Sequence, residues 1–279
     1  MNTQHASAFV NGDRVSVIDI TDRGLQYGDG VFETLRVHHG KPVWWAPHME
    51  RLLDGCHRLQ ISRLPDIEIL RQEADSLLVD YPAGTLKIII TRGNSSSGYG
   101  APADIMPNRV LIAKSGLRHQ AKSGQGIVLG VCRQRLSGSQ QLSGIKHLNR
   151  LEQVLARLEC QEQSWDEGVM LDDNERVIEG SMSNLFAWQQ GRLLTPRLEQ
   201  TGINGICRQR IMSLAEKNEI KVEQCELDLD DLQDSDGLFV TNSLIGVWPV
   251  IRFINREFEI DKRTRLLQAK LETDICSAG

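Results

Sequence analysis

Residues 143–159 read SGIKHLNRLEQVLARLE, and they place a lysine where a glycine-containing turn runs into a helix. Apolar residues recur at helical spacing through this stretch, at Leu148, Leu151, Val154, Leu155 and Leu158. The lysine, Lys146, has two interpretations. It can be a solvent-exposed charge at a helix end, or its amine can be partly neutral and form an imine with an aldehyde cofactor. The local pattern alone favours the exposed charge, so the choice depends on the rest of the chain.

The bulk composition is that of an ordinary globular protein. The chain has 279 residues, of which 40% are hydrophobic and 25% charged, and its formal net charge is −5. The acidic balance argues against binding to nucleic acid. No apolar run is long enough to cross a membrane, and the N-terminus lacks the pattern of a signal peptide. We therefore expect a cytoplasmic protein with neither a membrane nor a nucleic acid as its partner.

The cysteines point to the same compartment. There are six, at positions 56, 132, 160, 207, 225 and 276. They form no C-x-x-C pair, and no histidine stands at metal-ligand spacing from them. We expect reduced thiols, no disulfide framework and no metal site.

Strand-like and helix-like runs follow one another without a regular rhythm. Expected strands are 9–18 (a hairpin about Asn11-Gly12), 31–37, 42–45, 86–91, 109–113, 126–133, 167–172, 177–179, 184–188, 222–227 and 237–241. Expected helices are 47–59, 66–79, 148–158 and 205–217. This order predicts an α+β fold. The polar stretch 114–125 is the expected linker, giving a small N-terminal α+β domain (1–118) and a larger C-terminal α+β domain (119–279) that carries Lys146.

Three further features are compatible with a cofactor site. Glu179 ends a strand beside small residues, where a carboxylate can meet a protonated pyridine nitrogen. The segment 200–208 is a glycine-containing turn that feeds a helix, and the N–H groups of a helix N-terminus suit a phosphate. Arg51, on the first helix, has the forked donors that bind phosphate. Taken singly, each has an ordinary alternative: a solvated carboxylate, a plain helix start or a surface ion pair.

Arg92 follows the strongly apolar strand 86–91. A guanidinium at such a strand end often meets a carboxylate, either a substrate's or the protein's own. The sequence leaves these two alternatives open.

The order of these segments resembles the fold type IV enzymes that depend on pyridoxal 5′-phosphate (PLP). The matching strings are GDGVFETLRV (28–37), HMERL (48–52), TRG (91–93), GIKHLNRLEQVLAR (144–157), VIEGSMSNLF (177–186), NGICR (204–208) and TNSL (241–244). The group includes branched-chain and D-amino acid aminotransferases and 4-amino-4-deoxychorismate lyases. The resemblance runs from about Phe9 to Pro249, and the string KHLNRLEQVLAR is similar to the lyases in particular.

The resemblance implies a role for each matching residue. Lys146 would be the Schiff-base lysine and the proton-transfer base, and Thr34 would help to protonate the leaving group. The residues implied for the cofactor are Glu179 at the pyridine nitrogen, Asn184 near that side of the ring, and Arg51, the N–H groups of Ile206 and Cys207, and Ser243 at the phosphate. Those implied for the substrate are Tyr27, Arg92 and Asn242.

The resemblance also implies a reaction and an assembly. The reaction is conversion of 4-amino-4-deoxychorismate to 4-aminobenzoate and pyruvate, a step of folate biosynthesis, by Schiff-base exchange on Lys146, proton abstraction and elimination. The assembly is a homodimer of two-domain chains. One position departs from the pattern: Ser97 stands where similar lyases often carry an arginine. This departure leaves open which group, besides Arg92, meets the second carboxylate of the substrate.

Two other functions remain open at this stage. One is a D- or branched-chain amino acid aminotransferase on the same fold, against which KHLNRLEQVLAR and Thr34 argue. The other is a PLP-binding or carrier protein without catalysis, in which Lys146 would hold cofactor while Thr34 and Arg92 had no role.

Overall fold

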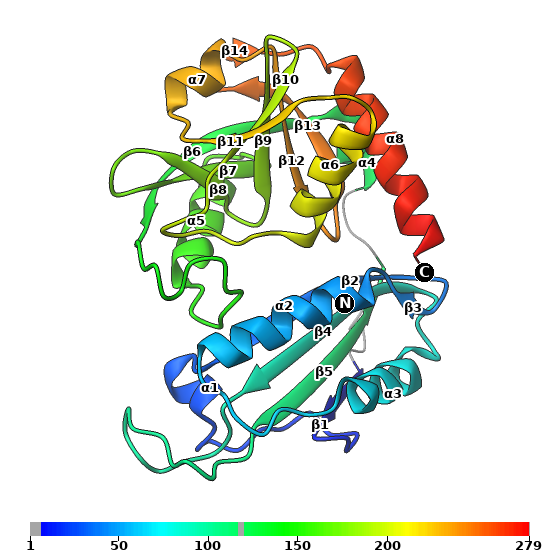
Figure 1. Cartoon of the computed structure of the whole chain (residues 1–279), viewed down its shortest axis with the longest axis vertical. Helices are drawn as coiled ribbons and strands as arrows, with labels where there is room; N and C mark the ends of the chain where they lie inside the picture. Colours follow the sequence, from blue (N-terminus) through cyan, green and yellow to red (C-terminus); the bar gives the residue numbers. More distant parts are fainter. Residues whose placement is uncertain (1–6, 117–119, 279) are drawn as a thin grey trace. The chain divides into compact units, whose positions relative to one another are not determined.

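The computed structural model describes residues 7–116 and 120–278, and the chain divides into two compact units (Figure 1). Unit 1 contains the described residues up to 116, together with Ile145–Asn149 and the end of the chain from Ile275. Unit 2 contains the residues from 120 to Gly144 and Arg150–Asp274. Both units combine helices with sheets, which confirms the expected α+β class. The expected boundary at 118/119 lies outside the described residues.

Unit 1 is built on a five-stranded antiparallel sheet with the order β1-β5-β4-β2-β3. Its strands are β1 (Ser7–Val10), β2 (Gly30–His38), β3 (Lys41–Pro42), β4 (Ala83–Thr91) and β5 (Asn108–Ser115). The central pair, β2 and β4, runs without a break from Gly30 opposite Thr91 to His38 opposite Ala83. Because side chains alternate along a strand, one face of β2 carries Val31, Glu33 and Leu35, and the other carries Phe32 and Thr34.

Two helices cover one face of this sheet. They are α2 (Trp45–Arg58) and α3 (Ile67–Leu78), and a short helix, α1 (Arg23–Tyr27), precedes β2. Met49, Leu52 and Cys56 of α2 pack with Val31 and Leu35 of β2 in the core of the unit. Their spacing along α2 is the helical period read from the sequence. The helices therefore fix which face of β2 is buried and which carries Phe32 and Thr34.

The segment Ile145–Asn149 pairs with β2 and belongs to unit 1. The N–H of Phe32 donates to the carbonyl of Lys146 at 2.9 Å, and the N–H of Leu148 donates to that of Gly30 at 3.0 Å. The side chain of Ile145 is buried in the core of this unit. The assignment of Lys146 to the C-terminal domain was therefore wrong. The physical reason is that backbone pairing to a distant strand leaves no signal in local composition.

Unit 2 contains a nine-stranded mixed sheet with the order β11-β10-β9-β12-β13-β6-β7-β8, and β14 pairs with β13. The strands are β6 (Ile127–Leu136), β7 (Glu167–Asp172), β8 (Val177–Gly180), β9 (Asn184–Gln189), β10 (Arg192–Pro196), β11 (Val222–Cys225), β12 (Gly237–Asn242), β13 (Gly246–Phe253) and β14 (Arg256–Glu257). The helices are α4 (Gln120–Gln125), α5 (Leu151–Glu162), α6 (Ile206–Lys217), α7 (Leu229–Asp234) and α8 (Lys262–Ser277).

The observed elements differ from the expected ones at several places. The turn at Asn11-Gly12 forms, but residues 14–18 make no strand, and β1 pairs with β5 instead. The expected linker contains α4, in which Lys122 pairs with Asp166 at 2.6 Å. Of the expected strand 42–45 only Pro42 lies in a strand, and helices α1, α7 and α8 and strands β10, β13 and β14 were not predicted. These strands are defined by their partners rather than by a clear alternation of their own.

The apolar stripe of α5 points away from the core of its unit. Its members are 50–77% exposed, and they are Leu151, Val154, Leu155 and Leu158. The buried side of the helix is formed by Ala156 and Cys160. An amphipathic pattern normally marks the face that turns to the core. Here the period predicted the helix correctly but did not predict which face is buried.

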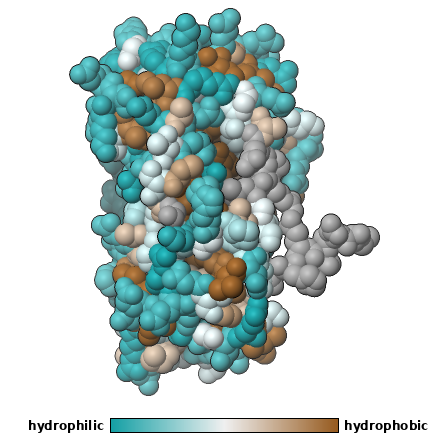
Figure 2. Space-filling view, turned by 90° about the vertical axis from the view of Figure 1, so that its right-hand side faces the viewer, coloured by the Kyte–Doolittle hydropathy of each residue, from teal (hydrophilic) through white to brown (hydrophobic). Residues whose placement is uncertain are grey.

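No helix among residues 7–116 and 120–278 is both long enough and apolar enough to span a membrane. On the face drawn in Figure 2, apolar side chains form small patches separated by polar ones.

Candidate active site

Lys146 lies on the face of the unit 1 sheet that α2 and α3 do not cover. Its neighbour His147 forms a bridge with Val31, so Lys146 stands beside Phe32. The Nζ atom of Lys146 lies 4.4 Å from the centre of the Phe32 ring. Lys146 is therefore held by backbone pairing on one side and by a ring on the other. This contrasts with the freely exposed helix-end lysine that the local sequence pattern favoured.

Thr34 lies on the same face, two residues along β2 from Phe32. It stands directly opposite Lys87 of β4. The Nζ atom of Lys87 lies 4.8 Å from the centre of the Phe32 ring. Strand pairing thus places one aromatic ring, one hydroxyl and two amines on a single surface.

Arg51 lies on α2, at the opposite face of β2. Its Nε and Nη2 atoms donate to the two oxygens of Glu33, each at 2.7 Å. Glu33 is fully buried and also accepts a hydrogen bond from Nδ1 of His48 at 2.7 Å. A guanidinium has five N–H donors, so this pair does not exhaust Arg51. The Glu33 contact fixes the plane of the group that is expected to meet a phosphate.

The charges of this triad are set by burial and by each other. Burial would raise the pKa of Glu33, but the charge of Arg51 and the bonds from His48 and Arg51 hold it at about 2. Burial lowers the pKa of His48 most strongly, the contact with Glu33 opposes this, and the charges of Arg51 and Lys146 lower it further. Near neutral pH, Glu33 is ionised and His48 is neutral. The Nε2 atom of His48 is buried and has no partner among the described residues.

Arg92 is bound by the protein's own groups. Its Nε and Nη2 atoms donate to Asp29 at 2.7 and 2.9 Å. It also donates to the backbone carbonyls of Leu59 and Gln60 at 2.7 and 2.8 Å. Of the two alternatives left by the sequence, the structure shows a protein carboxylate. Arg92 ties the end of β4 to the start of β2 and the end of α2.

The loop that carries Ser97 is fastened by a second buried arginine. Arg23 donates to Asp29 at 2.9 Å and to the carbonyls of Ser97, Gly98 and Tyr99 at 2.7–3.3 Å. The ring of Tyr27 contacts that of Tyr99 in the same loop at a tilt of 58°, with ring centres 5.5 Å apart. The loop is therefore held by its backbone, and position 97 itself contributes no charge.

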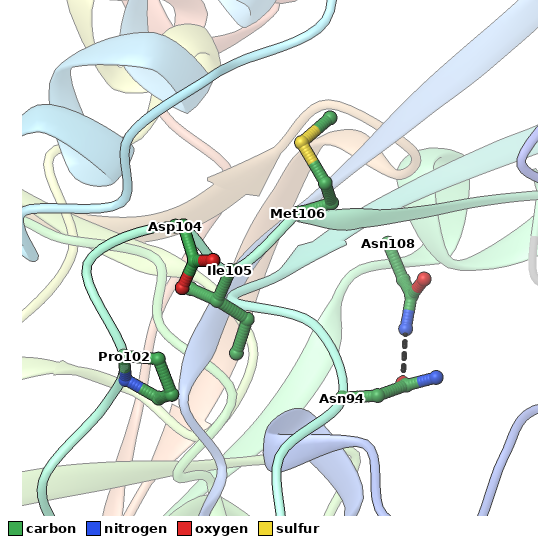
Figure 3. A pocket seen from close by; sticks show the side chains of 6 residues that line it. All are labelled: Asn94, Pro102, Asp104, Ile105, Met106 and Asn108. Carbon is green, nitrogen blue, oxygen red and sulfur yellow. Dashed lines mark hydrogen bonds between the residues drawn. The ribbon is translucent and has the colours of Figure 1, made fainter.

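A cavity of about 360 Å³ lies at the base of this loop (Figure 3). It is lined by Asn94, Pro102, Asp104, Ile105, Met106 and Asn108. The side-chain nitrogen of Asn108 donates to Asn94 at 2.7 Å, as the dashed line in Figure 3 shows, and to the buried carboxylate of Asp22 at 2.8 Å. None of the expected site residues lines it, so we interpret it as part of the support of the loop.

In unit 2, two expected residues hold the backbone of the same residue, Ile203. The Oε2 atom of Glu179 accepts from the N–H of Ile203 at 2.8 Å, and the Nδ2 atom of Asn184 donates to the carbonyl of Ile203 at 2.8 Å. Both side chains are at most 6% exposed. Glu179 also lies within electrostatic reach of Arg150 and Arg208. The strands β8 and β9 thereby position the turn that leads into α6.

The N-terminus of α6 has the character of an anion site. The helix begins at Ile206, and no side chain caps it. A Cβ on the preceding residue, Gly205, would lie 2.1 Å from Oδ1 of Asn184, so only glycine allows this close approach. The sulfur of Cys207 lies 2.7 Å from the hydroxyl of Thr241 at the end of β12. The N–H groups of Ile206 and Cys207 thus lie in the first turn of α6. This turn follows the close contact between Gly205 and Asn184, and Cys207 joins it to Thr241 of β12.

Asn242 is the last residue of β12, and Ser243 follows in the next turn. Asn242 donates to the carbonyl of Met182 at 2.9 Å and accepts from the N–H groups of Leu244 and Ile245. It therefore joins this turn to the one between β8 and β9. Ser243 is half-buried within the same turn. Within unit 2, Glu179 and Asn184 meet at the turn before α6, and Cys207 in the first turn of α6 contacts Thr241 near the end of β12. That these residues and Ser243 form one cofactor site stays a prediction.

The donors present fit PLP. An uncapped helix N-terminus with a nearby hydroxyl suits its phosphate, and a buried carboxylate suits its pyridine nitrogen. Lys146 supplies the amine that its aldehyde requires. The helix start and the carboxylate belong to unit 2, and Lys146 belongs to unit 1.

Sequence reasoning missed Glu33, His48 and Asp29. A usable signal existed for Glu33, because it lies on the apolar side of the alternating strand VFETL, where an unpaired charge would be costly. His48 lies three residues before Arg51 on the same helix face, which is the spacing for a shared partner. For Asp29, no pattern in the sequence indicated that it would take both Arg92 and Arg23.

Comparison with known proteins agrees with these arrangements. The family model described as amino-transferase class IV matches residues 30–253. An aminodeoxychorismate lyase of Vibrio harveyi is 34% identical over 95% of this chain and 99% of its own length. The crystal structure of 4-amino-4-deoxychorismate lyase from Pseudomonas aeruginosa is similar with a TM-score of 0.91 and 38% identity, over 96% of this chain and 99% of that one. A D-alanine aminotransferase of Listeria monocytogenes is 31% identical over 84% of this chain and 82% of its own length.

Proposed function

The chain belongs to the class IV aminotransferase family, and we propose that within this family it is a PLP-dependent aminodeoxychorismate lyase. The observation that carries the proposal is the sheet face on which Lys146 stands beside Phe32 and near Thr34. The chain is also similar to two lyases over almost the whole length of each, and this similarity supports the same activity.

The reaction requires one proton to leave the substrate and one bond to break. When bound, PLP supplies an aldehyde for the substrate amine and a ring that accepts electrons. Lys146 removes the proton from the amine-bearing ring carbon. The ether bond to the neighbouring carbon then breaks, and Thr34 or Lys146 donates a proton to the enolpyruvyl group, which leaves as pyruvate. The six-membered ring becomes aromatic as 4-aminobenzoate, so atoms and electrons balance without a further reactant.

The remaining residues hold the cofactor and shape the substrate side. Glu179 would pair with the pyridine nitrogen, and Asn184 would lie near that side of the ring. Arg51, the N–H groups of Ile206 and Cys207, and the hydroxyl of Ser243 would hold the phosphate. Tyr27, Arg92 and Asn242 act on the substrate side through the loops they support. The contacts of Arg92 with Asp29 favour this indirect role over direct contact with the substrate.

We also propose that the enzyme is a homodimer. The support is the exposed stripe of α5, formed by Leu151, Val154, Leu155 and Leu158. Four apolar side chains at helical spacing make a continuous surface that water disfavours. A second copy of the chain would bury this surface.

A cytoplasmic location completes the proposal. All six cysteines lie within the described residues, and all are free thiols. Persistent thiols, four of them buried, suit a reducing compartment.

An aminotransferase is the second candidate, since D-alanine aminotransferases are among the relatives. One assay separates the two activities. Purified protein loaded with PLP should convert 4-amino-4-deoxychorismate to pyruvate and 4-aminobenzoate in equal amounts. Formation of a 2-oxo acid from D-alanine or a branched-chain amino acid, without pyruvate from aminodeoxychorismate, would replace the lyase with the aminotransferase. Full cofactor occupancy without turnover of any amine would leave a binding protein.

A further inference from the structure

Cys132 and Cys160 bring their sulfur atoms together in the interior of unit 2. Cys132 lies on β6 and Cys160 on α5, and both side chains are fully buried. A Cβ added to Gly168 of β7 would lie 2.8 Å from the sulfur of Cys160 and closer still to that of Cys132. The two sulfurs are therefore less than about 6 Å apart, and rotation of the side chains can bring them to bonding distance. Because Gly168 has no side chain, it leaves the room in which the two thiols meet.

The two thiols differ in how readily they lose a proton. They share a hydrogen bond, which lowers the pKa of Cys160 most strongly; burial opposes this, and the charge of Arg157 lowers the pKa further. The same hydrogen bond raises the pKa of Cys132, and burial raises it too. The thiolate, rather than the thiol, is the nucleophile. Cys160 is therefore the sulfur that reacts first, beside a second thiol that keeps its proton.

Cys160 lies near the end of α5, where a small solute can reach it. The helix ends at Glu162, two residues further on. The terminal turns of helices open at the smallest cost in free energy. The buried side chains of α5 are Ala156 and Cys160, so little apolar area holds this end of the helix to the sheet. Brief opening of the last turn exposes the sulfur of Cys160 to a molecule as small as hydrogen peroxide.

The chain between the two cysteines includes the segment that carries Lys146. It leaves β6, contributes Ile145–Asn149 to unit 1, and returns along α5. Cys132 and Cys160 lie in one buried cluster, so a bond between them would join the two ends of this excursion. A cross-link across a loop of this length restricts the unfolded chain and stabilises the folded one.

We propose that Cys132 and Cys160 form a reversible oxidation site, at which a peroxide produces a disulfide that ties α5 to β6. First, the Cys160 thiolate attacks hydrogen peroxide and becomes a sulfenic acid, and the hydroxide that leaves takes up the proton that Cys160 lost. The sulfur of Cys132 then attacks the sulfur of Cys160, the S–O bond breaks, and the oxygen leaves with the Cys132 proton as water. The two thiols lose two electrons and two protons in total, and the peroxide becomes two molecules of water. A thiol reductant reverses the reaction, so free thiols are the resting state in a reducing compartment.

The direct test oxidises PLP-loaded wild-type protein with hydrogen peroxide. Catalase then removes the peroxide, and the remaining thiols are alkylated before digestion. Mass spectrometry of the unreduced peptides should show one disulfide, between the peptides that contain Cys132 and Cys160. Dithiothreitol should restore both thiols. Cys276→Ser removes an exposed thiol and is the matched control, in which the same disulfide should form to the same extent.

Two further measurements test the order of the steps and the effect on the fold. In Cys132→Ser, Cys160 should stop at the sulfenic acid and be labelled by dimedone, whereas Cys132 in Cys160→Ser should take up less than about a tenth as much label. The melting temperature of wild type should rise by roughly 5 °C on oxidation. Cys276→Ser should show the same rise, and neither of the other two serine variants should show it.

Three results would overturn the inference. If folded wild type forms no disulfide between these residues, or forms one only in denaturant, the two thiols do not react in the native protein. Equal dimedone labelling of the two single thiols would contradict the assignment of Cys160 as the first to react. A melting temperature that stays the same or falls on oxidation would show that the bond does not tie α5 to β6. The first and last results come from wild type, so they hold even if a serine variant fails to fold.

Discussion

The two units differ in the kind of chemical group that each would offer to a cofactor. In unit 1 the expected groups are mainly charged side chains on a rigid sheet and helix, with Lys146 on one face of β2 and Arg51 on the other. In unit 2 they are mostly backbone N–H groups at the start of α6, positioned by Glu179 and Asn184. The two units would therefore have different roles in the reaction. On the proposal above, unit 1 would supply Lys146 and Thr34, the groups that move protons, and unit 2 would supply most of the groups that hold the cofactor.

The largest effect is expected for Lys146→Ala, which tests the role proposed for unit 1. It removes the amine that is proposed to hold the cofactor aldehyde and to move the substrate proton. Turnover should fall by roughly 10⁴-fold or more, and the visible absorbance of bound cofactor should disappear. Lys114→Ala is the control, and it should change neither reading. Full lyase activity in Lys146→Ala would show that the reaction does not depend on this lysine.

The next effect in size is on stability, at Glu33→Gln. The pKa of Glu33 is about 2 in the folded protein, against an ordinary value of 4.5. The ionised group therefore stabilises the fold above pH 4.5, and this contribution is lost as the pH falls toward 2. This lowering of the pKa corresponds to a stabilisation of the folded state by about 3 kcal/mol at pH 7. Urea unfolding should show a loss of this order in Glu33→Gln and a weaker acid dependence below pH 4.5.

The control for Glu33 is Glu175→Gln, which removes an exposed partner of Arg135. It should change the free energy of unfolding by less than about 1 kcal/mol. If Glu33→Gln is equally mild, the buried triad does not anchor α2 to β2.

Glu179→Gln tests whether Glu179 acts in the reaction or only holds the turn before α6. A glutamine oxygen can still accept from the N–H of Ile203, so the turn should keep its place. The negative charge beside the cofactor ring is lost, and kcat should fall roughly 100-fold while the cofactor stays bound. Stopped-flow turnover and cofactor absorbance measure the two effects. If the variant releases PLP but keeps the wild-type kcat when excess PLP is added, Glu179 helps to bind the cofactor and takes no part in the reaction.

Gly205→Ala should give the smallest change. Its φ of −64° suits alanine, but the added Cβ would meet Oδ1 of Asn184. Relief of that clash must move the start of α6, and the dissociation constant for PLP should rise about tenfold, an overpacking cost of roughly 1.4 kcal/mol. Gly138→Ala, where nothing lies within 4 Å of the added atom, is the control. Equal affinity for PLP in the two variants would show that the start of α6 does not bind the cofactor.

The local elements of the site were largely predictable from sequence. The period of α2 and the alternation of β2 gave correct helices and strands, because each has one face packed against the other. The start of α6 was predicted to within one residue, since glycine at a turn before a helix is a local signal. The family resemblance then linked these elements to PLP.

The rest depends on pairing between distant segments. Nothing local indicates that residues 145–149 pair with β2, so Lys146 was placed in the wrong domain. The apolar stripe of α5 was read correctly as a helix, yet its leucines are exposed. The partners of Arg92 and the position of Lys87 opposite Thr34 follow from strand register, which sequence pattern leaves undetermined.

The central claim is that Lys146, and not the second lysine beside Phe32, holds the cofactor. Reduction of the PLP-loaded enzyme with borohydride fixes the cofactor to whichever lysine carries it, and peptide mass spectrometry then locates the modification. The account predicts one reduced cofactor per chain, on the peptide that contains Lys146. A cofactor found on Lys87, or on any other lysine, would contradict it.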